Sequence, residues 1–109
     1  MGNDDGLGIL GLIGGVLLGA AALAAVIFVV KITYDAIKNY CNKAKEIPNA
    51  KTCEVVKEYL ASGKYRVVGS VFNTNGKQLD SKAWEGKEID DRLEREFGGR
   101  SKIVYDLTA

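Results

Sequence analysis

Histidine is absent from this chain of 109 residues, and proline, tryptophan and methionine occur once each. Without histidine, a serine–histidine catalytic pair, a histidine general base and a histidine metal site are all excluded. Only two cysteines are present, which excludes a disulfide-rich scaffold. The net charge is +1 and basic residues are matched by acidic ones, so the composition gives no electrostatic footprint for nucleic-acid binding.

Charge is also missing from one long segment, the apolar run from Leu7 to Val30. All 15 Lys and Arg and all 14 Asp and Glu lie outside this run. As a helix it would span roughly 36 Å at ~1.5 Å per residue, enough to cross a hydrocarbon core of about 30 Å. The sequence therefore predicts a membrane α+β protein, with a short tail over residues 1–6 and a single transmembrane helix over residues 7–30.

Two alternatives for the apolar run are a buried core helix and a cleaved signal peptide. A core helix would need more surrounding chain than 109 residues supply. A signal peptide begins with basic residues, whereas this chain begins with Asp4 and Asp5. Both alternatives are weaker than the spanning helix.

The residues that flank the run indicate its orientation. No basic residue precedes it, whereas several lysines follow it closely. The positive-inside rule therefore predicts an N-terminus outside and a cytoplasmic C-terminal part. We expect a basic juxtamembrane helix over residues 31–48, with Lys31, Tyr34 and Lys38 at the membrane interface.

Small residues recur within the run at three- and four-residue steps. They are Gly8, Gly11, Gly15, Gly19 and Ala22. On a helix these positions share one face and allow a second helix to approach closely. The pattern predicts packing against other transmembrane helices, from a second copy or another subunit. The alternative is that glycine and alanine are simply common in membrane helices.

Residues 49–109 are expected to form a small α+β cytoplasmic unit with the order α–β–β–α–β. The expected elements are a helix over 50–61, a strand over 64–72, a turn at Asn75-Gly76, a brief strand over 77–79, a helix over 88–97 and a strand within 101–107. A core of about sixty residues is marginal, so docking onto a partner would stabilise it.

No residue pattern in this unit indicates catalysis or metal binding. The acidic residues of 85–96 are interleaved with Lys and Arg, which is typical of a solvated helix face. Cys41 and Cys53 lack the further ligands of a zinc site, and a reducing cytoplasm disfavours a disulfide bond between them. We therefore expect no enzymatic activity, no cofactor and no metal.

The predicted function is that of a single-pass membrane-anchored interaction protein, a small subunit or adaptor of a membrane complex. The lipid bilayer and other transmembrane helices would be its partners. A cytoplasmic protein would bind by strand pairing at a sheet edge, or through Phe72 and Trp84 if they are exposed. The alternative is a self-assembling membrane structure, such as a small pore or a phage-type lysis factor. A membrane-tethered enzyme ranks last, since no nucleophile–base pair is recognisable.

Overall fold

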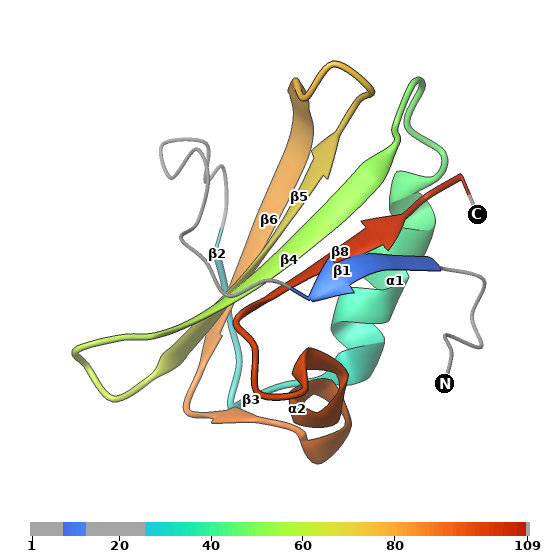
Figure 1. Ribbon diagram of the computed structural model, residues 1–109. Helices are drawn as coiled ribbons and strands as arrows, with labels where there is room; N and C mark the ends of the chain where they lie inside the picture. Colours follow the sequence, from blue (N-terminus) through green and yellow to red (C-terminus); the bar gives the residue numbers. More distant parts are fainter. Residues whose placement is uncertain (1–7, 13–25, 109) are drawn as a thin grey trace.

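Strands dominate residues 8–12 and 26–108, the part of the chain that the computed structural model describes (Figure 1). In chain order the elements are β1 (Gly8–Leu12), β2 (Val26–Phe28), β3 (Lys31–Ile32), α1 (Tyr34–Ala44), β4 (Thr52–Tyr59), β5 (Tyr65–Phe72), β6 (Gln78–Gly86), β7 (Glu88–Ile89), α2 (Asp91–Phe97) and β8 (Lys102–Asp106). Six strands form one sheet in the order β1-β8-β4-β5-β6-β2, and β3 pairs with β7 in a separate two-stranded sheet.

Across the six-stranded sheet, each neighbouring pair in the series β1-β8-β4-β5-β6 is antiparallel. The last strand, β2, pairs parallel with β6. A turn at residues 73–77 connects β5 to β6. There the Asn73 side-chain oxygen accepts hydrogen bonds from the backbone N–H groups of Asn75 and Lys77, both at 2.9 Å. Gly76 adopts φ 81°, a left-handed conformation that favours glycine. The expected Asn75-Gly76 turn is therefore present.

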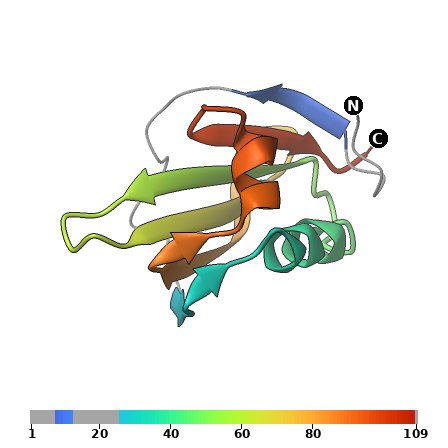
Figure 2. The same ribbon diagram turned by 90° about the horizontal axis from the view of Figure 1, so that it is seen from below.

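Both helices lie against the same face of the six-stranded sheet (Figures 1 and 2). Alternate residues of the central strands point to this face, because successive side chains of a strand point to opposite sides. The core between helices and sheet consists of buried apolar side chains from both layers. They include Ile37 and Cys41 of α1, Leu93 and Phe97 of α2, and Cys53, Val55, Val67, Val71, Trp84, Ile103 and Tyr105 of the sheet.

One carboxylate joins the starts of the two helices. Asp90 is the N-cap of α2, and its Oδ1 accepts a hydrogen bond of 2.8 Å from the Leu93 N–H. Its Oδ2 accepts a second bond, of 2.9 Å, from the N–H of Tyr34, the first residue of α1. Since the first N–H groups of a helix have no partner within it, Asp90 satisfies one in each helix.

The prediction of a transmembrane helix over residues 7–30 is wrong. Gly8–Leu12 and Val26–Phe28, near the two ends of this run, are strands β1 and β2 of the sheet. Within residues 8–12 and 26–108, no helix combines the length and apolar character needed to cross a bilayer. Hydropathy failed here because a continuous apolar run is compatible with a buried or edge strand as well as with a helix. The predicted membrane orientation depended on that helix, and the described residues do not test it.

The predicted order of elements is wrong as well. The region expected to be a helix over 50–61 contains β4, in which Cys53 and Val55 alternate toward the core. The three- and four-residue spacing of Cys53, Val56 and Leu60 had suggested a helix, but Thr and Val at 52, 55 and 56 favour a strand. The helix expected over 31–48 is shorter, since β3 precedes it and Thr33 caps α1 by accepting from the Ala36 N–H. The strands β5 and β8 and the helix α2 are present where the sequence predicted a strand, a strand and a helix.

Candidate interaction surface

The most exposed apolar segment of the described chain is Ile27–Val30, which we name the apolar edge. Phe28 is 71% exposed and Val30 is 75% exposed, while Ile27 and Val29 are each 37% exposed. The residues belong to β2 and the two positions that follow it. Four consecutive apolar side chains in contact with water are energetically costly, which makes the apolar edge a candidate interaction surface.

Backbone hydrogen bonds hold the apolar edge in place. The Val29 N–H donates to the Glu85 carbonyl at 2.8 Å, and the Val30 carbonyl accepts from the N–H groups of Lys87 and Glu88 at 3.1 and 3.2 Å. Gly86 allows this close approach, since a Cβ there would lie 3.0 Å from the Val29 carbonyl oxygen. These hydrogen bonds fix the backbone of the apolar edge relative to β6 and β7, so its side chains point in defined directions.

The outer side of β2 is the end of the sheet. β2 is the last strand in the order of the described strands, so no further described strand pairs with it. Because the Val29 N–H points toward β6, strand alternation directs the Phe28 N–H to the outer side. Natural edge strands are often protected by lysine, proline or a bulge. Residues 26–30 contain neither lysine nor proline, and the next charged residue after them is Lys31.

Polar side chains border the apolar edge on both sides. Phe28 is in register with Glu85, whose Oε2 accepts from Arg66 Nε at 3.1 Å and Nη2 at 2.8 Å. Beyond the edge, the Lys31 Nζ lies 3.7 Å from Glu88 Oε1, and both side chains are more than half exposed. An apolar centre with a charged rim is the usual anatomy of a protein interface.

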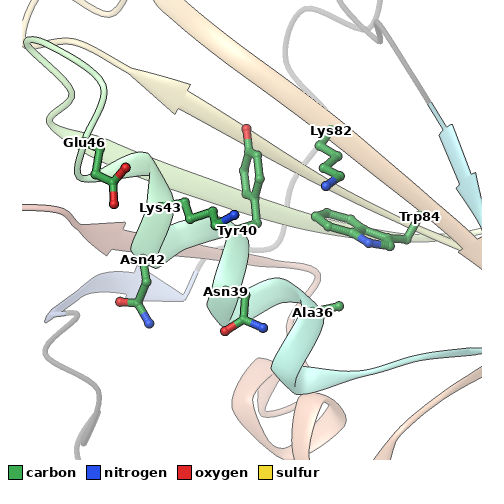
Figure 3. Close-up of a pocket in the computed structure, with 8 residues that line it drawn as sticks. All are labelled: Ala36, Asn39, Tyr40, Asn42, Lys43, Glu46, Lys82 and Trp84. Atoms are coloured by element: carbon green, nitrogen blue, oxygen red, sulfur yellow. The ribbon is translucent and has the colours of Figure 1, made fainter.

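A second candidate surface is a groove between α1 and β6. This open groove has a volume of about 460 Å³, and Trp84 and Lys82 of β6 face the helix across it (Figure 3). The Tyr40 and Trp84 rings meet edge to face at 5.7 Å between centroids, and the Lys82 Nζ lies 5.6 Å from the Trp84 ring centroid. The side chains lining the groove are mostly amides and charged groups. Among them are Asn39, Asn42, Lys43 and Glu46.

The phenol of Tyr40 is part of the lining of this groove. Burial raises the pKa of the Tyr40 phenol above its usual value, and a 2.8 Å hydrogen bond donated to Asp80 Oδ2 raises it further. The phenol therefore stays protonated and acts as a structural donor. The described lining includes neither a histidine nor a cysteine.

The two predicted partner contacts lie outside the apolar edge. Trp84 is only 4% exposed and belongs to the core, so the exposure on which its candidacy depended is absent. Phe72 is half-buried at the last position of β5. Neither residue lies in the apolar edge.

The predicted membrane-interface residues are spread over β3 and α1. Lys31 forms the surface ion pair with Glu88, and Lys38 lies on α1. Tyr34 is buried in the core, with the Arg92 guanidinium 4.1 Å from its ring centroid. A buried tyrosine is not available to lipid in this fold.

No described helix contains the small residues that were predicted to pack against a second transmembrane helix. Gly8 and Gly11 lie in β1, opposite Asp106 and Val104 of β8. Gly15, Gly19 and Ala22 lie outside the described residues.

The apolar edge was missed because it was assigned to the end of a membrane helix. A signal was present: residues 26–30 read VIFVV, all β-branched or aromatic, whereas the preceding residues are mainly Gly, Ala and Leu.

Within residues 8–12 and 26–108, no cluster of acidic, cysteine or histidine side chains could hold a metal ion.

Comparisons with models of known protein families, with curated proteins and with solved structures find no match for this chain.

Proposed function

We propose that the chain is a small protein-binding module that holds an extended segment of another protein along the outer side of β2. The observation that carries this proposal is the exposure of four consecutive apolar residues, Ile27–Val30, which span the end of β2, the last described strand of the sheet, and the two positions after it. In strand addition, main-chain hydrogen bonds supply affinity and alternate side chains supply specificity.

The two faces of β2 define the chemistry of the partner segment. Ile27 is in register with Trp84 on the helix-covered face, and Phe28 is in register with Glu85 on the opposite face. A bound strand would place its side chains alternately beside Ile27 and Phe28. The partner segment is therefore expected to be extended and apolar at alternate positions, without charge at the residue that meets Phe28.

The first experiment is a selection of displayed peptides on the full-length chain, followed by affinity measurements with two variants. Phe28→Lys places a charge in the centre of the apolar edge. Tyr59→Lys is the matched control, because Tyr59 is similarly exposed, at 68%, but lies on β4. Burial of a phenylalanine side chain contributes about 1.5–3 kcal/mol, so Phe28→Lys should weaken peptide binding by about tenfold or more.

Equal affinities of the Phe28→Lys and Tyr59→Lys variants for the selected peptides would contradict the proposal. Sedimentation of the chain without peptide shows whether the apolar edge instead binds a second copy of the chain. If the wild-type chain self-associates and Phe28→Lys alone prevents this, the partner of the edge is a second copy and not another protein.

A further inference from the structure

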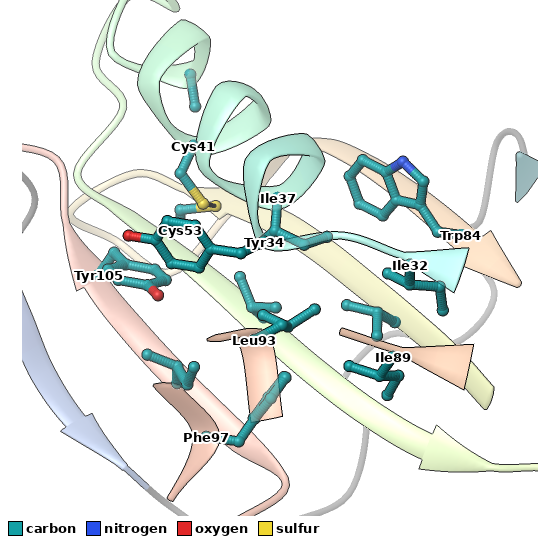
Figure 4. Packing of buried hydrophobic residues seen from close by; sticks show 14 of the residues in the cluster. Ile32, Tyr34, Ile37, Cys41, Cys53, Trp84, Ile89, Leu93, Phe97 and Tyr105 are labelled. Carbon is teal, nitrogen blue, oxygen red and sulfur yellow. Dashed lines mark hydrogen bonds between the residues drawn. The ribbon is translucent and has the colours of Figure 1, made fainter. Parts of the chain in front are cut away.

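The two cysteines of the chain meet in the core although they belong to different layers. Cys41 lies on α1 and Cys53 on β4, and both side chains are fully buried. Their Sγ atoms are 2.9 Å apart and point toward each other (Figure 4). A disulfide bond has an S–S length of about 2.05 Å, so formation of the bond needs an approach of less than about 1 Å.

The surroundings of the pair exclude a metal site. The chain has no histidine and no third cysteine, and the described acidic residues do not cluster with the two thiols. Cys53 is in register with Val71 of β5 and Tyr105 of β8, so it occupies the middle of the sheet. A bond from this position would attach α1 to the strand around which the core is built.

We propose that Cys41 and Cys53 form an intramolecular disulfide bond when the protein folds in an oxidising compartment. The expectation that these thiols face a reducing cytoplasm depended on the transmembrane helix, and residues 8–12 and 26–108 contain no helix able to cross a bilayer. A small-molecule disulfide such as glutathione disulfide is a sufficient oxidant.

The reaction proceeds by two thiol–disulfide exchanges. The thiolate of one cysteine attacks a sulfur of glutathione disulfide, breaks its S–S bond and expels a glutathione thiolate, leaving a mixed disulfide. The thiolate of the other cysteine then attacks the protein sulfur of the mixed disulfide and expels the second glutathione. Two electrons pass from the cysteine pair to glutathione disulfide, and the two thiol protons end on two molecules of glutathione.

Burial determines when this reaction occurs. The hydrogen bond with Cys41 and burial both raise the pKa of the Cys53 thiol, which reduces its thiolate fraction. No oxidant reaches fully buried sulfurs without an opening of the fold. The bond is therefore formed during folding, and the folded reduced chain is oxidised slowly.

The test compares the equilibrium constant for disulfide formation in the native and the unfolded full-length chain. Reduced chain is equilibrated with mixtures of reduced and oxidised glutathione, in native buffer and in concentrated urea, then acid-quenched, alkylated and analysed by mass spectrometry. Cys41 and Cys53 are 12 residues apart. For a loop of this size, the native fold should favour the bond by about 10²-fold over the unfolded chain. Equal constants, or native chains that carry only glutathione adducts or intermolecular disulfides, would overturn the proposal.

Thermal unfolding gives a second, independent measurement. By linkage, a bond that the native fold favours must stabilise that fold by the same factor, so the oxidised chain should melt on the order of 10 °C above the reduced chain. The double variant Cys41→Ala/Cys53→Ala is the control and should melt at one temperature in both buffers. Equal melting temperatures of oxidised and reduced wild-type chain would overturn the proposal.

Discussion

At the scale of single residues, Asp90 connects the starts of the two helices. Its two carboxylate oxygens accept from Leu93 in α2 and from Tyr34 in α1, so one side chain fixes the relative position of two helix starts. Asp90→Ala removes both acceptors and should lower the free energy of unfolding by roughly 2–3 kcal/mol. Asp90→Asn keeps one oxygen and should lose about half as much.

Urea denaturation of the variants measures this effect. The neighbouring Asp91→Ala is the control, because Asp91 is exposed and caps neither helix. Its cost should stay within about 0.5 kcal/mol. A cost for Asp90→Ala no greater than that for Asp91→Ala would show that the double cap does not hold the helices.

At the scale of elements, α1 packs on β5 through a fitted pair, Tyr40 and Gly69. A Cβ at Gly69 would lie 2.7 Å from Tyr40 Cε2 and 2.8 Å from Cδ2, so the ring occupies the place of a side chain. Gly69→Ala should therefore destabilise the protein by about 1–3 kcal/mol. In a Tyr40→Ala background the added methyl group has room, and the cost of Gly69→Ala should largely disappear.

A double-mutant cycle, with unfolding free energies of the four proteins, measures this coupling. The same cost of Gly69→Ala in both backgrounds would mean that the ring of Tyr40 does not determine the need for glycine at this position.

The elements that local sequence predicts are those with strong local signals. The Asn75-Gly76 turn and the helix capped by Gly98 are of this kind, since Gly76 and Gly98 supply left-handed conformations. β4 was mistaken for a helix because both periodicities fit its apolar residues, and tertiary packing decided between them. The sequence predicted that a partner would pair with a sheet edge. It did not predict that this edge is β2.

At the scale of the whole molecule, the apolar run was misassigned because its ends pair with distant strands. β1 pairs with β8 near the other end of the chain, with Gly8 opposite Asp106, and β2 pairs with β6. No local pattern encodes such long-range pairs. The mean hydropathy of the run was therefore consistent with a membrane helix. Its ends form strands because β8 and β6, which lie far away in the sequence, pair with them.

Amide hydrogen exchange resolved by residue tests the central claim most directly, that the outer side of β2 binds an extended protein segment. In the free chain, the Val29 N–H bonds to the Glu85 carbonyl and should exchange slowly, while the outward Phe28 N–H should exchange fast. On saturation with a selected peptide, the account predicts that exchange at Phe28 slows by about tenfold or more. Peptide binding that leaves Phe28 unprotected, with new protection confined to the groove between α1 and β6, would contradict it.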